Sequence, residues 1–240
     1  MIRTSPEKMP AGTDDRYTAT LQVEVIADMI CPWCYLGKRR LADALAAVRG
    51  PSQVRWVPFQ LNPAMPEDGM PLEDYLRERF GDPAALEPAL AELTRRGLAE
   101  GIRFRFDRIA RIPNTLNAHR LLRLTEVSGM DTFAVAEDLL KGFFEEGLDI
   151  ADQDVLAEIG KRQGMTAADV FETLGDDNAR ELVLSHEAQL RQSGVSGVPD
   201  FLVNRRLLVV GAQSTATLID AFDRAMFGDE SNYPVSATLH

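Results

Sequence analysis

The chain contains two cysteines, and they stand two residues apart in the stretch Cys31-Pro32-Trp33-Cys34. The reactive form of a cysteine is its thiolate. A spacing of two residues places both sulfurs on one helical turn, close enough to form a small disulfide ring. Cys31 could then attack a partner disulfide, and Cys34 could resolve the mixed disulfide by attacking Cys31. The spacing therefore predicts dithiol–disulfide exchange chemistry.

The flanking residues indicate that Cys31 lies where a strand ends and a helix begins. Residues 21–27 carry apolar side chains at alternating positions before a short apolar run, which is typical of a strand. Beyond Cys34 the apolar residues recur at roughly helical spacing, until residues 50–51 supply a Gly-Pro stop. Pro32 suits the first turn of a helix, and the N–H groups at a helix N-terminus stabilise a thiolate. A cysteine pair with this placement is typical of a thioredoxin-like redox motif.

Other interpretations of the cysteine pair are half of a zinc site, a structural disulfide and two core cysteines. Zinc takes about four ligands, but the chain has no further cysteine. Its three histidines are not at metal-ligand spacing: His119, His186 and His240. A disulfide across four residues would constrain little chain, while buried free cysteines are common in cores. We expect redox chemistry and no metal.

Composition and charge indicate a globular protein without a strong attraction to polyanions. Of the 240 residues, 45% are hydrophobic and 26% are charged, which allows a sizeable core. The net charge of −11 argues against binding to nucleic acids or anionic membranes. The chain has no run of about 18 apolar residues that would predict a membrane span. Residues 1–20 lack the apolar core of a secretory signal, so we expect a cytoplasmic protein, in whose reducing compartment a cysteine pair is more often catalytic or redox-sensing than structural.

The rest of the chain predicts one sheet built from its two ends. Residues 53–61 form a second expected strand, and strand, helix and strand in this order predict a parallel βαβ unit. Residues 198–204 and 206–211 predict a β-hairpin, and residues 214–227 predict a final helix capped by Ser214. Between these parts we expect an extended connector at 101–106 and no strand. The expected helical segments are 72–80, 83–100, 114–129, 131–146, 152–160, 166–174 and 177–192.

These elements predict an α/β fold in which a helical region interrupts the sheet domain. We expect flexible tails at residues 1–18 and 229–240. The first part of the sheet domain covers residues 19–70, the helical insertion covers 71–193, and the second part of the sheet domain covers 194–228. No internal repeat or low-complexity tract is evident.

Three motifs, taken with this order of elements, carry a resemblance to a known family. They are Cys31-Pro32-Trp33-Cys34 after the first strand, Gly197-Val198-Pro199-Asp200-Phe201 before the hairpin, and Pro113-Asn114-Thr115-Leu116-Asn117-Ala118-His119-Arg120 in the helical region. The chain resembles the DsbA family of the thioredoxin superfamily, and within it the FrnE-like cytoplasmic oxidoreductases. The resemblance covers roughly residues 20–228. It implies a DsbA-like, thioredoxin-like fold with a large all-helical insertion.

The resemblance implies catalytic roles for three residues. Cys31 is the expected nucleophile and Cys34 the resolving thiol. Pro199 would follow a cis peptide bond and lie beside the disulfide, and Val198 would offer its backbone to an incoming chain by β-strand addition. From the residues alone, Val198-Pro199 is more typical of an ordinary strand start than of a cis bond.

Four further residues are candidates for contact with the substrate. Pro32 and Trp33 would tune access to the Cys31 sulfur, although Trp33 also fits an exposed packing residue. Asn114 and His119 are candidates from the third motif, with a helix cap and a hydrogen-bonded helical histidine as the respective alternatives. The basic stretch at residues 38–40 predicts a solvated helix face, or an attraction for an acidic ligand such as glutathione.

The function expected from the resemblance is that of a thiol-disulfide oxidoreductase or protein disulfide isomerase. Its redox group would be the Cys31–Cys34 disulfide, without another cofactor, and its partners would be protein or small-molecule thiols and disulfides, with glutathione as a co-substrate. One alternative is a glutathione-dependent kappa-type transferase or 2-hydroxychromene-2-carboxylate-type isomerase. Another is a non-enzymatic redox-sensing binding module. The second cysteine pair of some FrnE-like proteins has no counterpart here.

Overall fold

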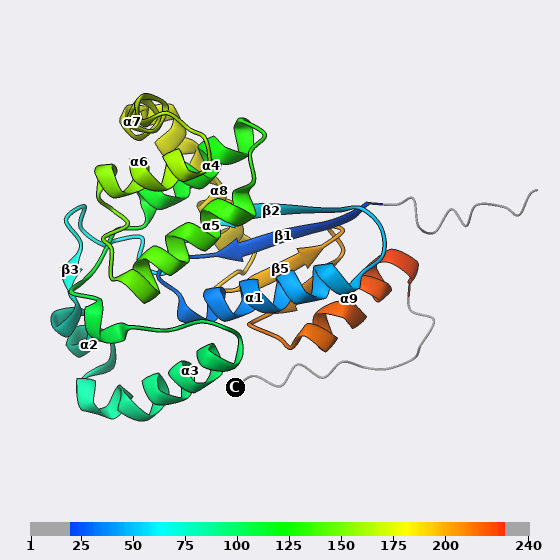
Figure 1. Ribbon diagram of the computed structural model, residues 1–240, viewed down its shortest axis with the longest axis horizontal. Coiled ribbons are helices and arrows are strands. Elements are labelled where there is room, and N and C mark those ends of the chain that lie inside the picture. The colour runs from blue at the N-terminus through cyan, green and yellow to red at the C-terminus, as the bar shows by residue number, and fades with distance from the viewer. Residues whose placement is uncertain (1–19, 229–240) are drawn as a thin grey trace, which may run out of the picture.

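The computed structural model describes residues 20–228 of the chain (Figure 1). The expected tails at residues 1–18 and 229–240 lie outside this part. Its strands are β1 Leu21–Ala27, β2 Ser52–Pro58, β3 Met70–Pro71, β4 Arg111–Ile112, β5 Asp200–Val203 and β6 Leu207–Val210. Its α-helices are α1 Pro32–Ala47, α2 Leu72–Phe80, α3 Glu87–Ala99, α4 Leu116–Val127, α5 Thr132–Lys141, α6 Gln153–Arg162, α7 Ala167–Gly175, α8 Asp177–Gln192 and α9 Thr215–Phe227. Two 3₁₀ turns and one π-helical turn add Pro83–Leu86, Phe106–Arg108 and Gly142–Glu146.

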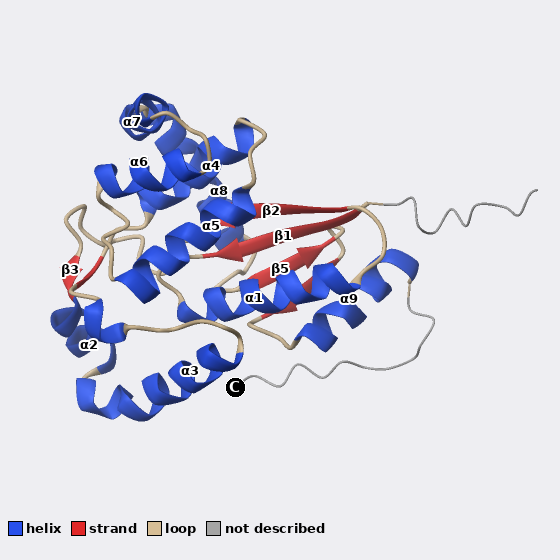
Figure 2. Ribbon diagram, in the orientation of Figure 1, coloured by secondary structure: helices blue, strands red, loops and turns tan. Residues whose placement is uncertain are grey.

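Both ends of the described chain contribute strands to the central sheet, as the sequence predicts (Figure 2). The strand order is β2-β1-β5-β6. β1 runs parallel to β2 and antiparallel to β5, while β5 and β6 form the expected hairpin. The hairpin turn is centred on Asn204 and Arg205, whose φ angles are 48° and 55°. This left-handed conformation matches the right-handed twist of the paired strands.

The alternation of β1 sends its side chains into two different layers. One set joins the main core of the molecule: Leu21, Val23, Val25 and Ala27. This set shares its face with Phe201 of β5, which pairs with Val25 and packs on α1. Ile26 points the other way and packs with Val57 and Phe59 near the end of α8. The C-terminal end of the central strand is therefore buried on both sides, which fixes the position of the residues that follow.

The helices between the two halves of the sheet form a region of their own. α4, α5 and α8 contact β2, and α3 contacts α1, so the region extends from the edge of the sheet to the first turns of α1 (Figure 1). Side-chain caps begin two of its helices. Asp131 accepts hydrogen bonds from the first N–H groups of α5, and Thr166 forms a capping box with Asp169 at the start of α7. The domain boundaries at residues 71 and 193 stay a prediction.

The helical region differs from the sequence prediction in two details. A two-residue ladder pairs β3 with β4, in a stretch where no strand was expected. A ladder this short has too few residues for an alternating pattern. The helix expected over residues 83–100 begins with a 3₁₀ turn, and the helix expected over 131–146 ends in a π-helical turn. Within residues 20–228, no helix combines the length and apolar character needed to cross a bilayer.

Candidate active site

Cys31 occupies the N-cap position of α1, with its backbone still extended at φ −92° and ψ 113°. A short turn joins the end of β1 to it, and its N–H donates to the carbonyl of Asp28 at 3.3 Å. Pro32 takes the first helical position, as expected. Cys34 lies one turn along and its N–H donates to the carbonyl of Cys31 at 3.0 Å. Both cysteines are buried, with free thiols.

The far end of the chain supplies the other wall of the site. The Cys31 thiol donates to the carbonyl oxygen of Val198 at 3.6 Å, across 167 residues of sequence. The Val198–Pro199 peptide bond is cis, as the resemblance implies. Pro199 is buried and Val198 is partly exposed. Cys31, Val198 and Pro199 are thus brought together.

Gly37 on α1 allows this close approach. A Cβ atom built there would lie 3.0 Å from Phe201 Cζ and 3.1 Å from Pro199 Cγ. Both contacts are tighter than ordinary van der Waals contact, so a side chain at this position would push Pro199 and the start of β5 away from α1. Nothing in the spacing of residue 37 marked it as part of the site, because its partners are more than 160 positions away.

The protonation of Cys34 is set by its surroundings. Burial raises the pKa of the Cys34 thiol well above its ordinary value, and its hydrogen bond with Cys31 raises it further. The negative charge of Asp28 acts in the same direction, while a backbone hydrogen bond at Asp28 opposes the shift. Cys34 is therefore held as a thiol at neutral pH, which suits a group that reacts second.

Trp33 is the exposed member of the motif. It is 37% exposed, and the guanidinium of Arg96 from α3 lies 5.5 Å from the centre of its ring. The helical region therefore reaches the residue between the two cysteines that is most exposed, and it contributes a cation beside an aromatic face. Pro32 is partly buried beside it.

His119 is a buried residue of α4 whose side chain lies near that of Asp28. Its side chain is fully buried, and Nε2 lies 3.3 Å from Asp28 Oδ1, an ion-pair distance without hydrogen-bond geometry. Asp28 is also fully buried, and its carboxylate accepts from the N–H groups of Met29 at 2.8 Å and Leu61 at 2.7 Å. Asp28 was not among the residues predicted to form the site. The signal that could have pointed to it is a charged residue at the end of a buried strand, three positions before Cys31.

Asn114 braces the loop that follows β2. Its amide donates to the carbonyl of Met65 at 2.7 Å and its Oδ1 accepts from the N–H of Leu116 at 2.9 Å. Gln60 also donates to Oδ1, at 3.3 Å. These contacts give Asn114 a capping and loop-holding position at the start of α4, and its role toward a substrate stays a prediction.

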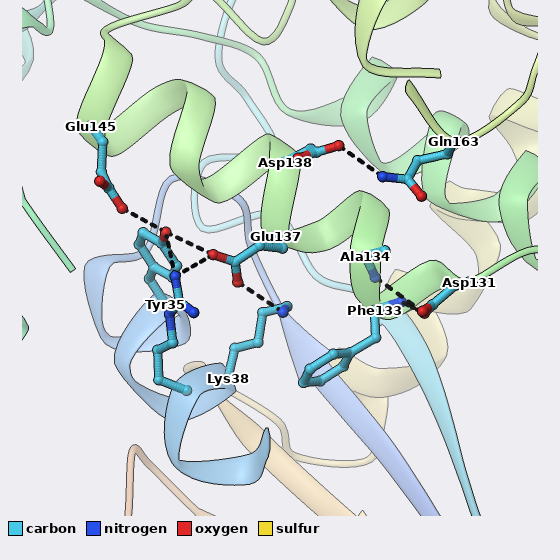
Figure 3. A network of polar contacts seen from close by, with 10 residues as sticks. Tyr35, Lys38, Asp131, Phe133, Ala134, Glu137, Asp138, Glu145 and Gln163 are labelled. Carbon is cyan, nitrogen blue, oxygen red and sulfur yellow. Dashed lines mark hydrogen bonds and ion pairs between the residues drawn. The ribbon is translucent and has the colours of Figure 1, made fainter. Parts of the chain in front are cut away.

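A network of polar side chains joins α1 to α5 (Figure 3). Glu137 accepts from Lys38 at 2.9 Å and also from Arg39. The Tyr35 hydroxyl lies 3.0 Å from Glu137 and 2.8 Å from Glu145 of the π-helical turn. The network therefore fixes the helix that begins at Cys31 to the helical region.

The opposite charges of this network stabilise one another in the largely buried contact between α1 and α5. Burial alone would raise the pKa of Glu137, but the positive charges of Lys38 and Arg39 lower it. Burial lowers the pKa of Lys38, and burial together with Glu137 raises the pKa of Tyr35. The expected solvated face is wrong for Lys38, which is 4% exposed. Its ammonium group lies 3.6 Å from the centre of the Phe133 ring and pairs with Glu137, so the protein itself satisfies the charge.

Comparison with known proteins agrees with the geometry. The family model of the DsbA-like thioredoxin domain matches residues 22–223. A probable DsbA oxidoreductase from Streptomyces coelicolor is 30% identical, with 90% of this chain and 94% of that chain covered and a TM-score of 0.79.

Two more distant structures share the fold. The cytosolic disulfide reductase DsbM from Pseudomonas aeruginosa, solved with GSH, is 22% identical, with 85% and 95% of the two chains covered and a TM-score of 0.58. A 2-hydroxychromene-2-carboxylate isomerase is 16% identical, with 85% and 95% covered and a TM-score of 0.64. The sheet order, the Cys31–Pro199 juxtaposition and the family match together show that this chain belongs to the DsbA-like thioredoxin family.

Proposed function

We propose that this protein is a thiol-disulfide oxidoreductase or protein disulfide isomerase that works through Cys31 and Cys34. The observation that carries the proposal is the position of the Cys31 sulfur. It lies at the N-terminus of α1 and 3.6 Å from the carbonyl of Val198, next to the cis Pro199. A helix N-terminus favours the thiolate, and the neighbouring strand end offers backbone groups to an incoming chain.

The proposed exchange has two steps. The Cys31 thiolate attacks a partner disulfide, a Cys31–partner S–S bond forms, and the first partner sulfur leaves as a thiolate with the electron pair of the broken bond. The Cys34 sulfur then loses its proton and attacks Cys31, so that the Cys31–Cys34 disulfide forms and the second partner sulfur leaves. The protein dithiol is oxidised and the partner disulfide is reduced; the same steps in reverse oxidise a partner dithiol.

The proposed partners are thiols and disulfides of proteins or of small molecules, and glutathione is the proposed co-substrate. The fold likeness to a cytosolic disulfide reductase solved with GSH is compatible with this choice. The proposed location is the cytoplasm, because the two cysteines of the chain are both committed to the site and none serves as a structural disulfide.

The test is the reduction potential of the Cys31–Cys34 pair, titrated in glutathione redox buffers with tryptophan fluorescence as the signal. We expect a two-electron equilibrium in the natural protein and none in Cys31→Ser. A potential near about −270 mV would indicate a reductant, and one near about −120 to −180 mV an oxidant or isomerase. The matched variant Cys34→Ser should accumulate a mixed disulfide with glutathione on Cys31, detected by intact mass.

Two results would overturn the proposal. A Cys31→Ser variant that keeps full disulfide exchange would remove Cys31 from the chemistry. Conjugation of glutathione to a chromogenic electrophile, lost in Cys31→Ser but kept in Cys34→Ser, would favour a kappa-type transferase, because such a reaction needs one activating group and no resolving thiol.

A further inference from the structure

The basic residues of α1 that were expected to attract an acidic ligand are bound within the protein. Lys38 and Arg39 both donate to Glu137. Arg40 donates to Glu100, the residue that ends α3, at 2.7 Å. Each of these cations therefore has a carboxylate partner already, and a substrate carboxylate would have to displace that partner in order to bind.

A different cation lies beside the cysteine motif. The guanidinium of Arg96 on α3 lies 5.5 Å from the centre of the Trp33 ring, and its side chain is 44% exposed. Glu92, one turn earlier in α3, accepts from Nε of Arg96 at 2.7 Å, while the terminal amino groups of Arg96 have no hydrogen-bond partner among residues 20–228. A guanidinium matches the geometry of a carboxylate. Arg96 therefore presents N–H donors to solvent at an aromatic face between the two cysteines.

This part of α3 carries an excess of positive charge, because Arg95 and Arg96 share one carboxylate. Arg95 donates to both oxygens of Glu92, from Nε at 2.8 Å and from Nη2 at 2.7 Å. Hydrogen bonds from Arg95 and Arg96 lower the pKa of Glu92 to about 2, so its carboxylate is ionised at neutral pH. One negative charge thus faces two positive charges. Arg95 turns its donors onto Glu92, whereas Arg96 keeps its terminal donors available.

The position of Arg96 relative to the cysteines is fixed by the contacts of α3 with its surroundings. α3 contacts α1, the helix that carries the motif (Figure 1). A Cβ atom built at Gly97 would lie 2.5 Å from Phe104 Cδ2, so the missing side chain allows α3 to pack closely on Phe104. Glu100 pairs with Arg40 of α1 at 2.7 Å, and both side chains are largely buried. Arg96 stands between these two anchoring contacts and the solvent.

We propose that Arg96 binds a carboxylate of glutathione when this molecule or its disulfide reaches Cys31, and that Trp33 packs against the same molecule. Glutathione carries a carboxylate at each end and its thiol in the middle, so one end can extend along the motif while the sulfur reacts. The guanidinium and the carboxylate would form charge-assisted hydrogen bonds beside an apolar ring. Arg96 is thus a specificity-determining residue that favours disulfides with a carboxylate over uncharged ones. The inference rests on the proposed function.

The test compares two disulfides that differ in charge. Oxidised glutathione carries carboxylates, and hydroxyethyl disulfide carries no charge. The reduced natural protein and the reduced Arg96→Gln variant are mixed with each disulfide, and oxidation is followed by acid quenching, alkylation and intact mass. Arg96→Gln should lose about tenfold more in its rate constant with oxidised glutathione than with hydroxyethyl disulfide, which is the lower end for a hydrogen bond to a charged group, since Arg96 is partly exposed. Added salt should reduce the advantage of the natural protein over the variant.

The matched control is Arg95→Gln, which removes the same charge and a bond to the same Glu92, and which should leave the preference for oxidised glutathione nearly unchanged. Equal losses with both disulfides in Arg96→Gln would indicate a structural role and overturn the inference. An unaltered preference in that variant, or the same loss of preference in Arg95→Gln, would overturn it as well. These results leave the proposed function standing, whereas a natural protein that exchanges with neither disulfide would refute the proposed function itself.

Discussion

Replacing Glu137 by glutamine should destabilise the protein, because the change leaves a buried cation without its counter-charge. Lys38 has a side chain that is 5% exposed, and Glu137 is its ion-pair partner at 2.9 Å. The same carboxylate accepts from Arg39 and lies 3.0 Å from the Tyr35 hydroxyl. The amide oxygen of glutamine could keep one of these hydrogen bonds, and the charge would be lost.

The expected loss is about 3 kcal/mol in the free energy of unfolding. Removal of one partner from a buried ion pair costs about 3–5 kcal/mol, and the lower end applies because Arg39 is partly exposed and one hydrogen bond can persist. For a chain of this size each kcal/mol lowers the melting temperature by about 2–4 °C. We therefore expect a melting temperature about 6–12 °C lower than that of the natural protein.

Thermal and urea unfolding at neutral pH measure this loss, with Glu158→Gln as the matched control. Glu158 pairs with Lys161 on an exposed face of α6, where such a pair contributes little. A second arm uses pH. Burial lowers the pKa of Lys38, so the orphaned ammonium should lose its proton as pH rises, and the loss of stability should shrink in alkaline solution. The double variant Glu137→Gln with Lys38→Met should recover much of the stability. The reasoning is wrong if Glu137→Gln is as mild as Glu158→Gln.

Two further predictions concern the residues around Pro199. Gly37→Val should destabilise the protein by about 1–3 kcal/mol through overpacking and should slow exchange with glutathione disulfide, because a Cβ atom there would lie 3.0 Å from Phe201 and 3.1 Å from Pro199. The control is Gly175→Val, since no atom lies within 4 Å of a Cβ built at that position. Equal effects of the two substitutions would contradict this prediction. Asp200→Asn should stabilise the protein by about 1–3 kcal/mol at pH 7–8. Burial raises the pKa of Asp200 to about 6. The contribution of Asp200 to folding stability is therefore most favourable below its pKa in the unfolded chain, and it is lost as the pH rises through its pKa in the folded protein. Urea unfolding across this range should show the gain vanish near pH 4, and a gain independent of pH would refute it.

The sequence predicted those parts of the fold that leave a local pattern. The alternation in residues 21–27 predicted β1 with its bounds, and the apolar runs around Asn204 predicted the β5–β6 hairpin. Helix caps such as Asp131 act within three residues, so they too can be recognised from the sequence. The β3–β4 ladder left no such pattern, since each of its strands has two residues.

The candidate site was predictable only where its chemistry is local. Cys31 and Cys34 can be recognised by their residue type and spacing. The position of Val198 and Pro199 beside Cys31, in contrast, was predicted from the family resemblance and not from the residues themselves. The partners of Lys38 and Gly37 lie on distant elements, Glu137 and Pro199 respectively. Burial of a lysine or a close packing contact at a glycine follows from tertiary structure, and no periodicity along the chain reports it.

The hydrogen bond between Cys31 and Val198 joins residues 167 positions apart in the sequence. This separation determines how long after Cys31 its partner is synthesised. A ribosome adds about 5–20 residues per second, so roughly 8–33 s pass between the synthesis of Cys31 and that of Val198. For most of that interval β2, which ends at residue 58, has been synthesised but β5 has not, since β5 begins at residue 200. The growing chain therefore carries its two thiols before the strand that borders the candidate site has been made.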